Sequence, residues 1–257
     1  MIYEEGKITP VDAKKLAVDV KDIFGIRCKY MGYLFKDIDG KDKKKLAFEI
    51  AKTRVKDIYK EKEAEPLPME INYEERKIDG KAGYGVVYDG FMLSRILMKF
   101  FPFKIGREIR VLITDRLIAT FDTDMRYHLR TCVLSGGWNL LSTNGLIHAP
   151  ARPKEFYFAK KFLGEKMDEV ATKEIENFLG DRFLKENDPR LQDAMLSLII
   201  QALFYSEFGE GFCSDKKCRL FNPHWQEEVI CALVQNGEMG LCDKHKEMLY
   251  SLKNDKN

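Results

Sequence analysis

The chain is organised around the stretch 188–245, which opens with DPRLQDAMLSLIIQALFYSEFG (188–209). Asp188 and Pro189 are typical of a helix start, because aspartate caps free N–H groups and proline has no N–H to leave unbonded. The segment that follows is almost wholly apolar, and a helix that is apolar all round lies inside a protein. We therefore predict a core helix over 190–208, ended by the glycine that follows it.

Three cysteines and a histidine follow this helix in two tight pairs. Cys213 and Cys218 have Cys-x4-Cys spacing, and Cys242 and His245 have Cys-x2-His spacing. Two such pairs separated by a longer insert are how a chain builds a closed tetrahedral zinc site. We predict a structural zinc ion on these four side chains, in a knuckle over 209–250. The alternative is a set of unrelated buried thiols near a surface histidine. Two other residues could substitute as ligands: Cys231 and His224.

This order of elements resembles the C-terminal half of the archaemetzincins, which are metzincin-like zinc peptidases. In that family the core helix carries His-Glu-x-x-His-x-x-Gly-x-x-His, followed by a cysteine. Placing that cysteine on Cys213 puts the motif's glycine on Gly209. The catalytic positions then fall on Ala202, Ser206 and Phe212 for the three histidines and on Leu203 for the general-base glutamate. None of these side chains can bind zinc or activate a zinc-bound water. The resemblance therefore implies the fold without the catalytic zinc.

Two further segments extend the resemblance toward the N-terminus. VLITDRL (111–117) is similar to the family's strand ending in Thr-Asp, and LSTNGL (141–146) is similar to its strand along the substrate cleft. A second archaeal family, also assigned to the metallopeptidases, has similar Arg-Tyr-His, Ala-Pro-Ala-x-Pro and Asn-x-His-Trp-Gln-Glu-Glu segments. The segments 36–82 and 148–165 are expected to be insertions relative to that family. The resemblance implies one α/β domain over 1–257, with a metzincin-like twisted mixed sheet flanked by helices.

Bulk properties narrow the class of protein. The formal net charge is +2 in 257 residues, so nothing favours nucleic acid or an anionic membrane as a partner. The sequence begins without the basic and apolar regions of a signal peptide, and its longest apolar run is too short to span a bilayer. Six cysteines without export favour thiols and metal over disulfides. We expect a cytoplasmic and, from the resemblance, archaeal protein.

The remaining pattern predicts a β-α-β start and a central sheet. Helices are expected from Thr9-Pro10 to Gly25, over 43–59 and over 91–101. Strands are expected at 2–3, 26–35, 69–78 (exposed), 108–113, 127–134 and 138–142. The last two strands are joined by Ser-Gly-Gly, which is typical of a hairpin turn.

Arg126, His128 and Arg130 alternate, so in a strand all three project from one face. Such a face suits a carboxylate or phosphate ligand, since arginine binds these groups bidentately. The alternative is a solvated face paired with acidic side chains of the same chain. We expect a cleft between the strand 138–142 and the apolar helix, with His128 and His224 on its walls and a peptide or acidic ligand inside.

Two functions from different classes follow. The leading hypothesis is a zinc-binding, metallopeptidase-like protein without the family's catalytic zinc, which acts as a binding or regulatory module through the cleft. The alternative is a metal-dependent hydrolase with a relocated site around His128 and His224, together with Glu207 or Glu210, because metals accept mixtures of histidine and carboxylate ligands. Whether the protein is an enzyme stays open at this point.

Overall fold

The computed structural model describes residues 1–6, 10–61, 65–83, 85–106, 108–164 and 169–254. Thr9, where the first helix was predicted to start, lies outside the described residues. The strands are β1 (Ile2–Glu4), β2 (Tyr30–Tyr33), β3 (Val87–Asp89), β4 (Arg110–Thr114), β5 (Leu117–Phe121), β6 (Tyr127–Arg130), β7 (Cys132–Val133) and β8 (Trp138–Ser142). The helices are α1 (Ala13–Phe24), α2 (Gly40–Lys52), α3 (Pro68–Ile78), α4 (Gly90–Phe100), α5 (Thr143–His148), α6 (Lys154–Leu163), α7 (Glu169–Leu179), α8 (Leu191–Phe208), α9 (Gln226–Glu228), a π-helical turn (Val229–Leu233) and α10 (Asp243–Asn254).

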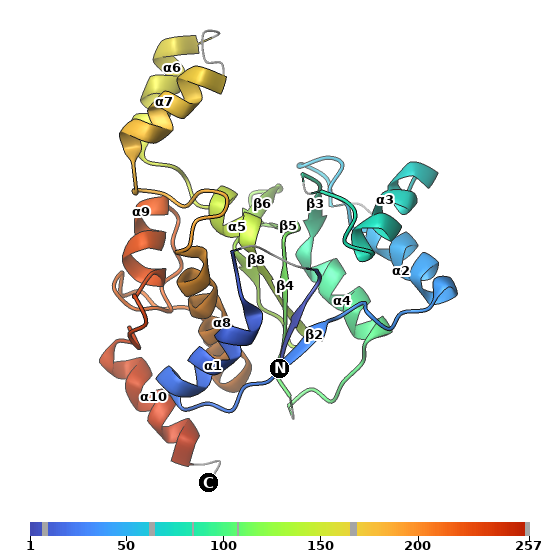
Figure 1. Cartoon of the computed structure of the whole chain (residues 1–257), viewed down its shortest axis with the longest axis horizontal. Coiled ribbons are helices and arrows are strands. Elements are labelled where there is room, and N and C mark those ends of the chain that lie inside the picture. The colour runs from blue at the N-terminus through green and yellow to red at the C-terminus, as the bar shows by residue number, and fades with distance from the viewer. Residues whose placement is uncertain (7–9, 62–64, 84, 107, 165–168, 255–257) are drawn as a thin grey trace.

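The strands form two sheets (Figure 1). The larger has the order β2-β1-β4-β8-β7 and the smaller the order β3-β5-β6. Neighbours in the larger sheet are parallel except β7, which runs antiparallel to β8. Every residue of β8 is buried, as expected for a parallel strand covered on both faces. The predicted mixed sheet flanked by helices is confirmed.

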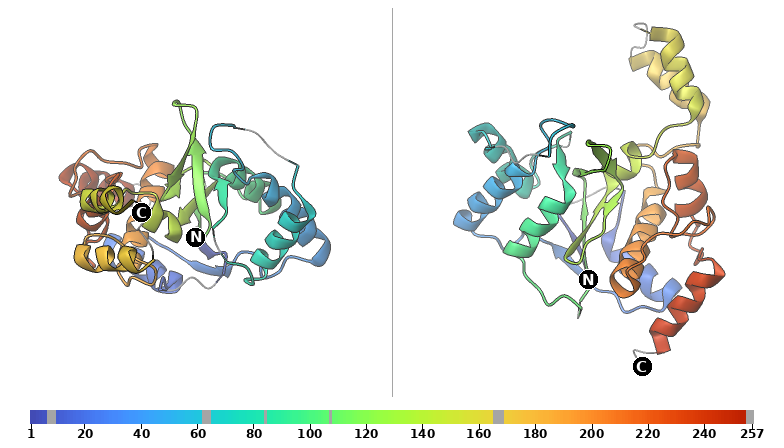
Figure 2. Two further views of the ribbon diagram at one scale, coloured as in Figure 1. Left: turned by 90° about the horizontal axis from the view of Figure 1, so that it is seen from above. Right: turned by 180° about the vertical axis from the view of Figure 1, so that it is seen from behind.

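Helices cover both faces of the larger sheet (Figure 2). On one face an apolar core joins Leu16 of α1, Val111 of β4 and Leu198 of α8. On the other face a second core joins Leu97 of α4 and Leu112 of β4. The two β4 residues are neighbours in the sequence and enter opposite cores, because side chains alternate along a strand.

Helix α8 is the central element of the first core. Residues 194–204 are all buried, and Gly209 ends the helix in the left-handed conformation, at φ 72. The prediction of a core helix closed by this glycine is confirmed. Its last turn, 205–208, is half-buried or exposed, so the expectation of burial on all sides was wrong there. That turn opens onto a cavity described below.

Residues 69–78 are helical and not the exposed strand predicted from the sequence. Helix α3 begins at Pro68, whose missing N–H costs nothing in a first turn. The Glu70 carboxylate accepts the N–H of the residue before the helix at 2.7 Å. The buried face of α3 carries the charged residues Glu74 and Lys77. A helix is recognised in a sequence by apolar residues at its buried positions, so this helix was missed.

Other boundaries also differ from the predictions. The strand expected over 127–134 is divided between two sheets, with β6 in the smaller and β7 in the larger. The helix expected over 43–59 spans Gly40–Lys52, and the strand expected over 26–35 contains only Tyr30–Tyr33. These differences arise because long-range strand pairing, which local patterns do not contain, sets the ends of strands.

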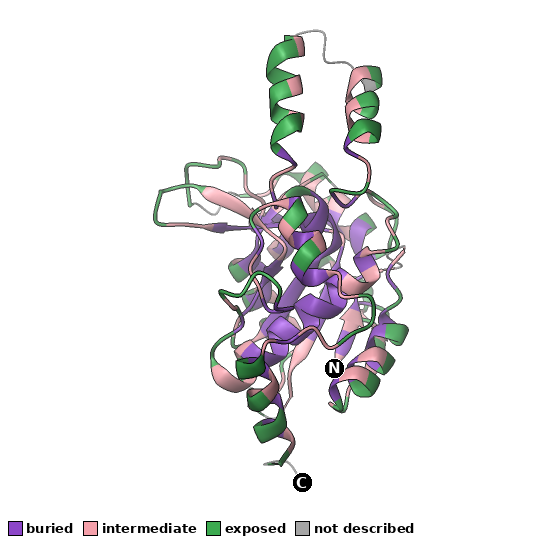
Figure 3. Cartoon of the chain, turned by 90° about the vertical axis from the view of Figure 1, so that its left-hand side faces the viewer, coloured by how far each residue is buried: buried purple, intermediate pink, exposed green. Residues whose placement is uncertain are grey.

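Helices α6 and α7 form a hairpin that projects from the rest of the chain (Figures 1 and 3). None of the α6 residues is buried, and several large apolar side chains are exposed on the two helices, among them Phe158, Phe162 and Phe178. Among the described residues, no helix combines the length and the apolar character needed to cross a membrane.

Gly145 in α5 has no room for a side chain. An added Cβ would lie 2.3 Å from the carbonyl oxygen of Arg130. We expect Gly145→Ala to lower the free energy of unfolding by about 1–3 kcal/mol, the usual cost of overpacking, as measured by urea denaturation. Gly40→Ala in α2 is the control, because nothing lies within 4 Å of its added Cβ, and alanine there should stabilise the helix by up to about 1 kcal/mol. Effects of the same sign at both positions would contradict this account.

Candidate metal centre and adjoining cavity

The first ligand pair lies on a tight loop after α8. The Cys213 N–H donates to the carbonyl oxygen of Leu220 at 2.8 Å, and the Cys218 N–H donates to that of Asp215 at 3.0 Å. The Asp215 N–H donates to Sγ of Cys213 at 3.3 Å. These bonds fold the loop back on itself and turn both sulfur atoms toward the same point.

The second pair lies at the start of α10. Cys242 directly precedes the helix, and its carbonyl oxygen accepts the N–H of Lys246 at 2.9 Å. His245 follows three residues later, so both side chains lie on one side of the first turn. The positive end of the helix dipole favours a thiolate at this position. The Arg219 N–H donates to the Gly240 carbonyl oxygen at 2.7 Å, which joins the two loops.

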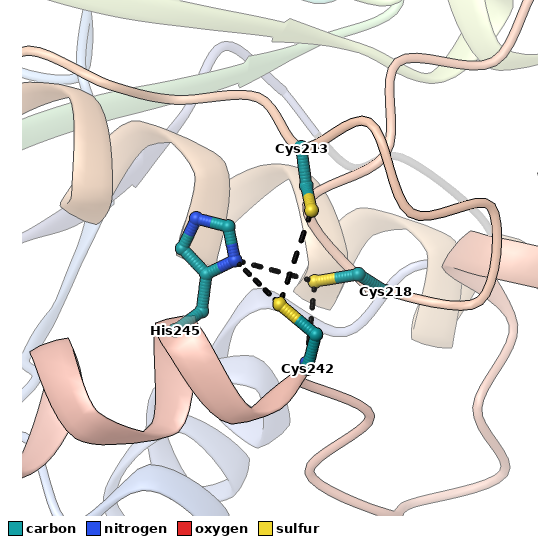
Figure 4. Close-up of side chains that lie close together, drawn as sticks. All are labelled: Cys213, Cys218, Cys242 and His245. Carbon is teal, nitrogen blue, oxygen red and sulfur yellow. Dashed lines mark hydrogen bonds between the residues drawn. The ribbon is translucent and has the colours of Figure 1, made fainter.

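The four predicted ligands meet at one point (Figure 4). Their ligand atoms all lie within 4.8 Å of one another. Sγ of Cys213 and Cys242 are 3.9 Å apart, and Nδ1 of His245 lies 3.7 Å from Sγ of Cys218 and 3.0 Å from Sγ of Cys242. A tetrahedral zinc ion bound by sulfur at about 2.3 Å and nitrogen at about 2.0 Å requires ligand separations of roughly 3.5–3.8 Å. The donor set and its spacing therefore fit a zinc ion.

Burial shapes the protonation of these ligands. Loss of hydration raises the pKa of the Cys218 thiol to about 12 and also raises that of Cys213. Loss of hydration, and then the nearby Lys244 ammonium, lowers the pKa of His245, so the imidazole is held in the neutral form that metals bind. Burial thus favours the protonated thiols. A bound cation would instead favour the thiolates, because a coordinating thiol is deprotonated outright.

Two contacts tie this Cys3His group to α8. The ring of Phe204 packs edge-on against the His245 imidazole, with centroids 5.4 Å apart. Arg219, which is fully buried, donates to Oδ1 of Asp193 at 2.9 Å and to Oγ of Ser197 at 2.9 Å. Loss of the metal should therefore loosen the packing against the central helix. Sequence reasoning missed the role of Arg219, because a charged residue in a loop is normally expected to be exposed to solvent.

The four positions onto which the resemblance places the catalytic motif differ in their burial. Ala202 is fully buried and Leu203 nearly so, while Ser206 is exposed and Phe212 is 42% exposed. The Cys3His group is the sole cluster of three or more potential ligands that the described part of the chain contains. No atom of α8 belongs to it.

A cavity of about 680 Å³ opens beside the last turns of α8. It lies between Leu203 and Ser206 of this helix, the loop at 26–29, and Asn139 near the start of β8. The expected cleft between the apolar helix and strand 138–142 therefore has a counterpart. His128 and His224 are not among the residues that line it, so the expectation that they form its walls was wrong.

The three alternating cationic residues of β6 bind acids of their own chain. Arg126 donates to an Asp124 carboxylate oxygen at 2.6 Å, and Nε2 of His128 lies 2.9 Å from the same group. Arg130 donates to Asp122 at 2.7 Å. The structure thus shows the solvated, internally paired face that was the alternative to a ligand site. None of the three lines the cavity.

The relocated metal site predicted as an alternative is not assembled. His224 is exposed, and its N–H donates to the Glu228 carboxylate at 2.9 Å. Glu210 forms an ion pair with Lys244 at 2.6 Å, and Glu207 lines the cavity. Within the described ranges, these residues and His128 do not form a group that could hold a metal. The possible substitute ligand Cys231 is exposed and lies outside the Cys3His group.

Comparison with known proteins agrees with this architecture. Residues 1–252 match the model of a probable metallopeptidase family (DUF6775). The structure is similar to the crystal structure of archaemetzincin from Methanopyrus kandleri, with a TM-score of 0.50 and 13% identity, over 98% of this chain and 93% of that chain. Comparison with curated proteins gives no match. The structural likeness confirms the predicted metzincin-like fold, and because the family model spans nearly the whole length, the chain belongs to this probable metallopeptidase family.

Proposed function

We propose that the chain is a zinc protein in which Cys213, Cys218, Cys242 and His245 hold a structural ion. The observation that carries this proposal is the convergence of all four ligand atoms within 4.8 Å. Four protein ligands complete a tetrahedral shell and leave no open position for water, which is the mark of structural and not catalytic zinc sites. The ion would supply folding free energy by joining the loop after α8 to α10.

We further propose that the chain does not use the catalytic zinc of archaemetzincins. The positions that correspond to its ligands and base carry Ala202, Ser206, Phe212 and Leu203, and none of these supplies an imidazole or a carboxylate. The protein would then act as a binding or regulatory module, with its ligand in the cavity beside α8. Supporting this, the cavity volume of about 680 Å³ lies in the range of small-molecule sites.

The cellular setting belongs to the same proposal. None of the six cysteines forms a disulfide, which suits the reducing cytoplasm. The similarity to a protein from Methanopyrus kandleri supports an archaeal source.

Metal stoichiometry tests the proposal directly. Protein purified without added metal should contain one zinc per chain by elemental analysis, and it should cleave no peptide in a mixed peptide library. Cobalt in place of zinc should give the absorption bands of thiolate coordination. Two tightly bound ions per chain, or metal-dependent peptide cleavage, would overturn the assignment and favour a hydrolase. As a control, Glu207→Gln and Glu210→Gln should leave the metal content unchanged.

A further inference from the structure

The cavity beside α8 has an apolar part and a polar part. Its apolar lining residues come from four separate parts of the chain and include Ile2, Val20, Ile26, Ile109, Val111, Ile199, Ile200 and Leu203. Several of them also belong to the core between α8 and the sheet, so the wall is fixed by packing. A rigid apolar wall favours an apolar ligand group, since burying each CH2 contributes about 0.8 kcal/mol.

Two free cations stand at the exposed part of the same lining. Arg27 and Lys29 both line the cavity and are exposed. Neither has an acidic partner within the described chain. Of the two acidic residues in the lining, Glu108 is already engaged by Arg110 at 3.0 Å and Glu207 has an interaction of its own. The unpaired charge at the cavity is therefore positive.

We propose that this cavity binds a carboxylate at the end of an apolar chain. The apolar part would lie against Ile199 and Leu203, and the carboxylate would bind Arg27 and Lys29. The proposal rests on the proposed function in placing the ligand beside α8, and it moves anion recognition away from the internally paired residues of β6. Two sources share this chemistry: a fatty acid, and a peptide that ends in an apolar residue with a free carboxyl group.

Binding of matched probes to the zinc-loaded protein tests the proposal. Calorimetry would compare dodecanoate with dodecanol, and N-acetyl-Leu-Phe with its C-terminal amide. In the pair from the true source, the acid should bind at least about tenfold more tightly, because a charge-assisted hydrogen bond is lost in the neutral analogue. The pair that shows this preference identifies the source.

Variants separate the two parts of the site. Arg27→Gln with Lys29→Gln should weaken the acid about tenfold or more and leave the neutral probe unchanged. Ile105→Ser should weaken both probes, because Ile105 lines the cavity and is 62% exposed, so the fold should tolerate the change. Lys14→Gln is the matched control, since Lys14 is exposed on α1 and is not part of the lining.

The outcomes distinguish this inference from the proposed function. Equal binding of acid and neutral probes, full acid affinity in the Arg27 and Lys29 double variant, or no binding by any probe would each overturn the ligand assignment, even with one zinc per chain. A second metal ion or peptide cleavage would overturn the proposed function, whatever the probes do.

Discussion

Replacing Cys218 with serine is expected to release the zinc and to lower the melting temperature of the protein by about 10 °C or more. Cys218 is 1% exposed, and its Sγ lies among the other three ligand atoms. Binding of a structural zinc contributes about 10–16 kcal/mol in small zinc peptides at neutral pH, which is comparable to the whole stability of a typical domain. Loss of even 3–5 kcal/mol would shift the melting temperature by roughly 6–20 °C in a chain of this size.

Calorimetry and elemental analysis of the same samples would measure the two effects together. Cys231→Ser is the matched control, because Cys231 is exposed and lies outside the Cys3His group; it should keep one zinc and the native melting temperature. A strong chelator should lower the melting temperature of the native protein toward that of Cys218→Ser and leave the variant unchanged. If Cys218→Ser retained a full equivalent of zinc, the assignment of this ligand would be wrong.

The parts of this molecule that the sequence predicted well depend on short-range spacing. Cys213 and Cys218 belong to one loop, Cys242 and His245 to one helical turn, and the apolar run of α8 ends at a glycine that adopts φ 72. The apolar run also predicted that α8 lies in the core, since a helix that is apolar all round must have neighbours on every side. The fold class came from the resemblance of this region to the archaemetzincins. Joining the two ligand pairs required only the knowledge that each pair is half of a tetrahedral site.

The parts that it predicted poorly depend on which segments meet. Alternation placed Arg126, His128 and Arg130 on one face, but the turn that supplies Asp122 and Asp124 neutralises that face. The relocated site failed because distances between segments depend on sheet order, which spacing along the chain does not contain. The cavity wall at 26–29 was missed for the same reason, since that loop is placed by the packing of α1 against α8 and by the parallel pairing of β1 and β2.

A buried charge network holds α3 against the larger sheet, although sequence patterns placed this segment in an exposed strand. Arg116 and Glu74 are 2% and 0% exposed, and they form an ion pair. Arg116 also donates to Oε1 of Glu5 at 2.7 Å, and Arg54 donates to Oε1 of Glu74 at 2.8 Å. Two carboxylates thus face two guanidinium groups. Tyr88 completes the network by donating to Glu74 at 2.9 Å.

Glu74→Gln is therefore expected to lower the free energy of unfolding by about 3–5 kcal/mol, the usual cost of leaving a buried charge without its partner. The buried Arg116 would then keep only the carboxylate of Glu5, and Arg54 would keep only its ion pair with Glu70. Urea denaturation would measure the effect, with Glu75→Gln as the control, because Glu75 is the next residue of α3 and forms no side-chain ion pair within the described chain. A loss within about 0.5 kcal/mol of the control would contradict a stabilising role. Zinc content should stay at one per chain in both variants, since the charge network shares no residue with the Cys3His group. This measurement separates destabilisation by loss of the charge network from destabilisation by loss of the metal.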